Sequence, residues 1–295
     1  MTTLPASLVT AQWLAENLAA PDLVVLDASY HLPAAGRDAA AEFAAAHIPG
    51  ARFLELATLL DPASPVPYAF PTPEQLATRL ASLGVGPDDA IVIYDDSAIR
   101  TSARAWFVLT ASGRKNVAIL GGGLGKWRAE GLPIESGAPA TAPAAPATFT
   151  APTRVRTKAD MLANLETRES QVLDARSADR VYGSGIDPVH GGQNGRIPGA
   201  LNLPFTEVLN ADGTYKSPQE LRAAFAAAGV DLAQPITATC GSGVTASVLL
   251  FALHLAGVDD AALYDGSWSE WGADPDTPKA QGPEAGGPEA GGPAA

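Results

Sequence analysis

The sequence predicts an α/β protein made of two copies of one domain, each a mostly parallel sheet flanked by helices. Two observations carry this prediction: short strands that are apolar throughout are separated by helix-like segments, and the same segments occur twice along the chain. Strands without polar alternation are typical of a parallel sheet that is covered on both faces. A chain of 295 residues is long enough for two such domains.

The internal repeat has an offset of about 145 residues. Residues 23–28 (Leu-Val-Val-Leu-Asp-Ala) return as 171–176, and the Ile-Pro-Gly-Ala turn at 48–51 returns at 197–200. Because the offset stays nearly constant from one segment to the next, the two halves are expected to be duplicates of one ancestral domain.

Each copy is expected to hold the same elements in the same order. In the first copy an apolar strand ends at Asp27-Ala28, and a Pro-Gly turn follows. A helix then begins at Thr72, which forms a capping box with Gln75 and has proline at the first helical position. A second apolar strand, a loop, another helix and a last strand at 117–120 complete the unit. This order is typical of an α/β fold.

Composition sets the expected boundaries. The first domain spans 1–135, and an Ala/Pro-rich, nearly uncharged stretch at 136–152 reads as an extended, semi-rigid linker. The second domain spans 153–278. Residues 279–295 repeat Gly-Pro-Glu-Ala-Gly, have little to bury, and are predicted to be a disordered tail.

Charge and composition exclude several classes of protein. The formal net charge of −13 argues against a nucleic-acid partner, which needs a basic face. The single cysteine excludes an internal disulfide and any zinc-cluster spacing. The N-terminus lacks the basic start of a signal peptide, and no apolar run reaches the roughly 18 residues of a membrane span. We therefore expect a cytoplasmic protein with no membrane partner.

The one cysteine, Cys240, begins a loop of small residues between a strand-like and a helix-like apolar stretch. Backbone N–H groups can converge on a sulfur at such a turn, and with the start of a helix they favour a thiolate. The alternative is a buried cysteine that acts as a small apolar side chain. The glycines on both sides of Ser242 favour the first interpretation, because core packing does not need them.

The run Cys-Gly-Ser-Gly-Val-Thr-Ala at 240–246 resembles the active-site loop of the 3-mercaptopyruvate sulfurtransferases, within the rhodanese superfamily. The resemblance covers about residues 7–278 and implies two tandem rhodanese-like domains, the first inactive and the second catalytic. It implies a sulfurtransferase that moves a sulfane sulfur from 3-mercaptopyruvate or thiosulfate through a persulfide on Cys240. The expected substrate-binding cradle is the rest of the loop: Gly241, Ser242, Gly243, Val244 and Thr245.

The resemblance also implies the partners. The donor is a small anion, and the acceptor is a thiol or cyanide, with thioredoxin as one candidate. No metal and no organic cofactor is implied. A catalytically weak sulfur-carrier or binding protein with the rhodanese fold is the alternative function. A cysteine phosphatase, which shares the loop architecture, is excluded because Ala246 stands where that chemistry needs an arginine.

Of the other functional positions of the family, only some have the usual residue in this sequence. The resemblance implies two arginines in the second domain that bind the carboxylate of mercaptopyruvate. The Asp-Ala-Arg-x-x-x-Arg pattern beginning at Asp174 places the first of them at Arg180, and Arg176 is expected to be a structural partner. The second arginine falls at Val189 or His190 and is therefore absent.

We expect the site in the cleft between the domains, because the second domain alone offers too few polar groups to close a pocket. The resemblance also implies a contribution from the first domain. The family's Ser-His-Asp constellation places the aspartate at Asp61 and the histidine near Tyr68, so the histidine is missing. The loop also lacks the basic residue of thiosulfate sulfurtransferases, so the sequence leaves the choice of donor open.

The repeat supplies an internal control. Aligning the two copies puts Asp95 where Cys240 stands, and the first loop, 95–100, has neither glycine nor nucleophile. A carboxylate there would repel an anionic substrate. The first domain is therefore expected to be silent.

Overall fold

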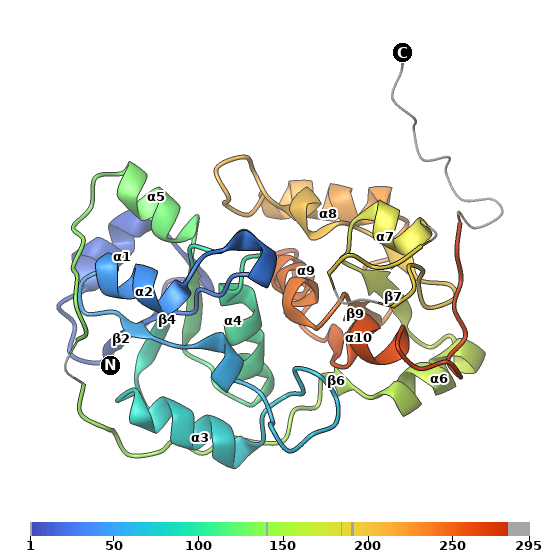
Figure 1. Cartoon of the computed structure of the whole chain (residues 1–295). Coiled ribbons are helices and arrows are strands. Elements are labelled where there is room, and N and C mark those ends of the chain that lie inside the picture. The colour runs from blue at the N-terminus through green and yellow to red at the C-terminus, as the bar shows by residue number, and fades with distance from the viewer. Residues whose placement is uncertain (1, 140, 184, 190–191, 283–295) are drawn as a thin grey trace.

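The structure, a computed structural model, describes residues 2–139, 141–183, 185–189 and 192–282. Two α/β domains lie side by side, with the blue-to-green half of the chain in one and the yellow-to-red half in the other (Figure 1). Each is built on a five-stranded sheet, with strand order β1-β5-β4-β2-β3 in the first and β6-β10-β9-β7-β8 in the second. All recorded strand pairs within these sheets are parallel. The prediction of two parallel α/β domains is confirmed.

The elements of the two domains follow the same order. The first domain contains β1 (Leu8–Val9), α1 (Ala11–Asn17), β2 (Leu23–Asp27), α2 (Ala39–Ala45), β3 (Arg52–Phe53), α3 (Pro73–Ser82), β4 (Ala90–Tyr94), α4 (Ser102–Ala111), β5 (Val117–Leu120) and α5 (Gly123–Ala129). The second contains β6 (Val155–Arg156), α6 (Lys158–Thr167), β7 (Gln171–Asp174), α7 (Ala178–Tyr182), β8 (Leu201–Asn202), α8 (Pro218–Ala227), β9 (Ile236–Thr239), α9 (Val244–Leu255), β10 (Ala262–Tyr264) and α10 (Ser267–Trp271). Short 3-10 turns lie at Pro33–Ala35, Leu56–Thr58 and Phe205–Val208.

The predicted helix starts form as the capping pattern requires. Thr72 accepts a hydrogen bond from the backbone of Gln75, whose side chain returns one to the Thr72 backbone. Ser217 and Glu220 make the same reciprocal pair at α8. Each box satisfies two N–H groups that a helix start otherwise leaves without partners.

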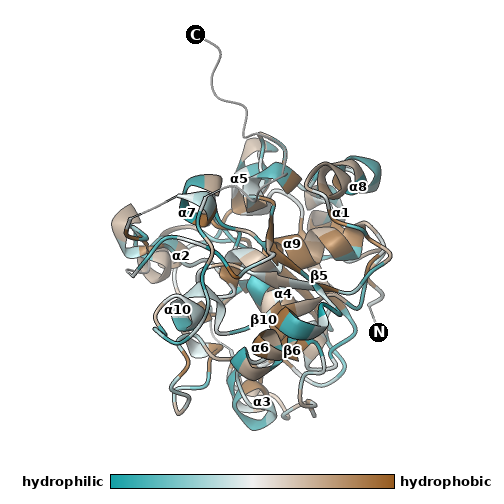
Figure 2. Ribbon diagram, turned by 90° about the vertical axis from the view of Figure 1, so that its right-hand side faces the viewer, coloured by the Kyte–Doolittle hydropathy of each residue, from teal (hydrophilic) through white to brown (hydrophobic). Residues whose placement is uncertain are grey.

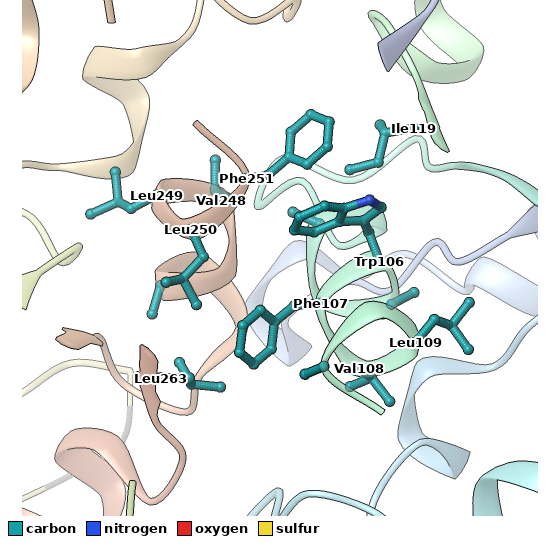
Figure 3. Close-up of a cluster of buried hydrophobic side chains, with 14 of the residues drawn as sticks. Trp106, Phe107, Val108, Leu109, Ile119, Val248, Leu249, Leu250, Phe251 and Leu263 are labelled. Carbon is teal, nitrogen blue, oxygen red and sulfur yellow. The ribbon is translucent and has the colours of Figure 1, made fainter. Parts of the chain in front are cut away.

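The two domains meet along α4 and α9. Both helices are apolar on nearly every face, so they are stable only where both sides are covered. α9 is coloured hydrophobic along its length and lies in the interior of the molecule (Figure 2). Trp106 of α4 meets Phe251 of α9 edge to face, with ring centroids 4.8 Å apart (Figure 3). The hydrophobic core therefore runs through the interface and holds the domains together.

The linker lies along the surface of the first domain. The backbone N–H groups of Gly137, Ala144 and Thr150 donate to carbonyls of Ala44, Ala81 and Ser112 respectively. Phe149 is buried. The stretch has no helix or strand of its own in its described residues, and these contacts fix its extended course.

The described C-terminal residues pack on the second domain. Arg196 and Ala280 exchange backbone hydrogen bonds of 2.9 and 3.0 Å, and the Arg196 guanidinium donates to the Gly282 carbonyl at 2.5 Å. Residues 279–282 therefore contact the domain rather than forming part of the tail predicted from 279 onward. The remainder of that predicted tail, 283–295, lies outside the described residues. Within the described chain, no helix is long and apolar enough to cross a membrane.

Candidate active site

Cys240 lies directly after the central strand β9, and α9 begins only a few residues later. The residue is 1% exposed. Gly243 caps the helix in the left-handed region, with φ of +78°, which favours glycine because a side chain would clash there. The predicted strand, loop and helix around the cysteine are thus present, and the glycine has a conformational reason to be there.

α10 holds the first part of the loop from outside. The Cys240 N–H donates to Ser267 Oγ at 3.3 Å, and the Cys240 carbonyl accepts from the Trp268 N–H at 2.9 Å. The Gly241 carbonyl accepts from the Ser269 N–H at 2.9 Å. These bonds fix the backbone of the cysteine itself.

The rest of the loop presents N–H groups without acceptors. In the described chain, no hydrogen bond leaves the backbone N–H of any residue in 241–245. The Ser242 and Thr245 side chains are half-buried in the same loop. Converging backbone donors at a helix start form a site for an anion, so the loop can hold a negatively charged sulfur or substrate group.

A buried ion network lies beside the loop. Arg176 is 2% exposed, its Nη2 is 2.6 Å from Asp174 Oδ2, and its Nη1 is 3.5 Å from Asp187 Oδ2. The guanidinium also stacks on Trp268 at 4.4 Å. Burial alone would lower the pKa of Arg176, but Asp174, Asp187 and the nearby Cys240 sulfur raise it above its usual value. Arg176 is therefore a permanent cation close to Cys240.

Arg180 shares the carboxylate of Asp187 with Arg176. Its Nε and Nη2 lie 3.1 and 2.8 Å from Asp187 Oδ2, and its side chain is 14% exposed. The predicted donor-binding arginine is thus held by a fork-shaped ion pair, and its charge is largely balanced. The expectation that Arg176 has a structural role agrees with its position in the network. Val189, at the place of the missing arginine, is 43% exposed, and His190 lies outside the described residues.

Asp61 is placed in the first domain, close to the start of α3. Its Oδ1 accepts from Gln75 Nε2 at 2.8 Å and from the Ala63 N–H at 3.1 Å. Its hydrogen bonds thus link it to its own domain, and its role at the site remains a prediction. Tyr68, at the position of the missing histidine, has φ of +57° and is 42% exposed.

Sequence reasoning missed the ion pair that joins the domains at the loop. Arg104 Nη2 of α4 lies 3.0 Å from Oδ1 of Asp265, a residue just before the Gly266 cap of α10. The available signal was an arginine within an otherwise apolar helix, since a buried charge needs a partner. Among the described residues, no three His, Cys, Asp or Glu side chains are grouped so that they could hold a metal ion.

Comparison with known proteins agrees with this arrangement. The family model for the rhodanese-like domain matches twice, at residues 10–130 and 157–274. The chain is 42% identical over 271 residues to human 3-mercaptopyruvate sulfurtransferase, covering 90% of this chain and 91% of the relative. It is 38% identical to thiosulfate sulfurtransferase of Bos taurus, covering 94% and 96%.

A solved structure of a relative supports the same family assignment. The crystal structure of SseA from Escherichia coli, described as a 3-mercaptopyruvate sulfotransferase, superposes with a TM-score of 0.81 at 38% identity. The match covers 91% of this chain and all of that one. Since both halves match one family model and the relatives extend over about nine-tenths of the chain, the protein belongs to the rhodanese superfamily and is a tandem-domain sulfurtransferase.

Proposed function

We propose that the protein transfers a sulfane sulfur from 3-mercaptopyruvate or thiosulfate to a thiol or cyanide through a persulfide on Cys240. The observation that carries this proposal is the row of backbone N–H groups without acceptors that follows the cysteine. These donors, with Arg176 beside them, favour the anionic states that a persulfide cycle needs.

The first half of the cycle loads the cysteine. The Cys240 thiolate attacks the donor sulfur, an S–S bond forms, and the bond between that sulfur and the rest of the donor breaks. With thiosulfate the electron pair leaves on sulfite. With 3-mercaptopyruvate it leaves on carbon as the enolate of pyruvate, which then takes up a proton. The loop N–H groups hold the anionic terminal sulfur during this exchange.

The second half returns the thiolate. A thiolate or cyanide acceptor attacks the terminal sulfur, and the S–S bond breaks with its electron pair left on Cys240. The products are an acceptor persulfide or thiocyanate. Thioredoxin is one thiol acceptor that fits this chemistry. The cycle is therefore a two-step exchange in which each product leaves before the next reactant binds.

The donor is supported by relatives of both kinds, since those at 40–43% identity are named 3-mercaptopyruvate sulfurtransferases and one at 38% is named thiosulfate sulfurtransferase. The test is a rate comparison of the two donors with one acceptor, together with intact mass of the enzyme after each donor alone. We expect one added sulfur per chain. Turnover without any added sulfur would contradict the persulfide, and loading without turnover would favour the alternative of a sulfur carrier.

A further inference from the structure

Arg104 reaches from the inactive domain into the catalytic one. It lies in the first turn of α4 and is 3% exposed. Its Nη2 donates to Asp265 Oδ1 at 3.0 Å and to the Tyr68 carbonyl at 3.1 Å. One arm of the guanidinium is thus fixed at the domain interface by a carboxylate of the second domain and a carbonyl of the first.

The other terminal nitrogen of the guanidinium, Nη1, has no hydrogen-bond partner among the described residues. This nitrogen is buried. A buried donor on a charged group is costly to leave unpaired, so such a donor indicates a ligand position. A Cβ added to Gly243 would lie 3.0 Å from this Nη1, so the free arm lies against the glycine that caps α9.

Arg104 also lines a cleft between the domains. The cleft is narrow, with a cavity volume of about 20 Å³, and its wall includes Tyr30, Leu56 and Tyr68 of the first domain with Val244 of the loop. Arg104 is the one charged residue on this wall. This volume is enough for a water molecule or for one oxygen of an anionic group, so only the charged end of a small anion would enter the cleft beside Arg104.

The two arginine positions that the family resemblance implies provide little binding for such an anion in this chain. Arg180 is balanced by Asp187, and Val189 replaces the second arginine. We propose that Arg104 Nη1 supplies the missing contact, donating to the carboxylate or sulfonate end of the sulfur donor while its sulfur lies at Cys240. This inference rests on the proposed function for the identity of the donor, but the anion contact itself can be tested without it.

The test compares alkylation of Cys240 by iodoacetate and by iodoacetamide, which differ mainly in charge. In Arg104→Met we expect the ratio of the iodoacetate rate to the iodoacetamide rate to fall about tenfold to a hundredfold, as expected for a lost hydrogen bond between charged groups. Damage to the fold or to the thiolate would change both rates by one factor. An unchanged ratio would overturn the proposal.

Two further variants serve as a control and as a change expected to have the opposite effect. Arg114→Met removes another buried arginine of the first domain, whose guanidinium donates to the carbonyls of Gly86, Pro87 and Asp89, and should leave the ratio unchanged. Asp265→Asn removes the carboxylate that balances Arg104 and should raise the ratio. If Arg104→Met fails to fold, Arg104→Gln removes the charge but can still donate to the Tyr68 carbonyl.

Donor kinetics separate this proposal from the proposed function. Arg104→Met should raise KM for the anionic donor about tenfold to a hundredfold with a much smaller change in kcat. A lower kcat at unchanged KM would show a purely structural role and overturn the proposal. If wild type forms no persulfide and yet the alkylation ratio depends on Arg104, the anion site stands and the proposed reaction fails.

Discussion

The two strand-to-helix loops, 95–100 and 240–245, occupy the same place in their domains but differ in what their backbone N–H groups bind. In the first loop the carboxylate of Asp95 accepts from the N–H groups of Ser97 and Ser102, each at 2.9 Å. In the second, the N–H groups after the cysteine have no acceptor among the described residues. The first loop thus fills its own anion site with its own carboxylate, and the Cys240 loop leaves that site open.

The residues beside the two loops also differ in charge. After β7, Asp174 pairs with the buried cation Arg176, which lies near Cys240. After β2, the equivalent Asp27 accepts from the Ser29 N–H at 2.8 Å, and no arginine stands there. The second domain therefore has a cation at the position where the first has Ser29, and its loop has backbone N–H groups without acceptors among the described residues. The two loops thus differ in more than the presence of a cysteine.

The largest expected effect is at the nucleophile itself. Cys240→Ser should abolish sulfur transfer without unfolding the protein, because the serine hydroxyl fills nearly the same volume but cannot form a persulfide. Intact mass after donor treatment should show one added sulfur on wild type and none on the variant. Residual transfer above background by Cys240→Ser would show that the open loop is not where the chemistry occurs.

The buried cation should matter next. Arg176→Met leaves Asp174 and Asp187 with fewer partners in the interior, and breaking a buried pair from one side typically costs about 3–5 kcal/mol of unfolding free energy. We expect a loss of that order in urea unfolding, together with slower alkylation of Cys240. Arg156→Met, which removes an arginine that donates to the Thr153 and Val155 carbonyls at the domain surface, is the control. A stable Arg176→Met with wild-type alkylation would remove the cation from the comparison.

The same site shows which features of the structure the sequence could predict and which it could not. The parallel sheets and the cysteine loop could be predicted because their signals are local: apolar strands, capping boxes and a short glycine loop. The Arg104–Asp265 pair could not, because its partners are 161 residues apart in the chain and meet only through domain packing.

The ion pair of Arg180 is a second feature that the sequence could not predict. The pattern places an arginine at position 180, but nothing in it indicates that Asp187, already bound by Arg176, also binds this side chain. Similarly, the repeat shows Asp95 as a missing nucleophile but not as a carboxylate that binds the helix-start N–H groups. Sequence patterns give residue types at positions, and the pairing of charges depends on tertiary contacts.

The variant Arg180→Ala tests whether the second domain binds the donor by itself. If it contacts the donor, Arg180→Ala should raise KM for both 3-mercaptopyruvate and thiosulfate about tenfold to a hundredfold, because both are anions. Arg180→Lys should recover part of the loss. Because Arg180 also supports buried Asp187, unfolding free energy should be measured in parallel. Unchanged KM values in a folded variant would leave Arg180 with the ion pair as its only role.

A smaller effect on stability is expected from pH at the first loop, 95–100. Burial raises the pKa of Asp95, although hydrogen bonds from Ser102 and Ser97 act in the opposite direction. A carboxyl whose pKa is higher in the folded than in the unfolded state contributes stability below its unfolded pKa, about 3.9, and loses it as pH rises through the folded pKa. Asp95→Asn cannot ionise, so its stability relative to wild type should increase as pH rises from 4 to about 7. Urea midpoints that differ by a constant amount across this range would contradict the shift.

The smallest expected effect is the restoration of the nucleophile alone. Asp95→Cys places a thiol at the position equivalent to Cys240, but Asp96 and Arg100 remain where the second loop has Gly241 and Thr245. In the first loop the N–H groups of Asp96 and Arg100 donate to Ser29 Oγ and the Ser97 carbonyl, so they are not free to hold a terminal sulfur. No cation equivalent to Arg176 lies there either, since Ser29 occupies that position. We therefore expect one added sulfur per chain after donor treatment of Asp95→Cys, and none when Asp95→Cys is combined with Cys240→Ser. Two sulfurs per chain would show that the position of the cysteine is sufficient and that the open loop contributes less than the comparison of the two domains indicates.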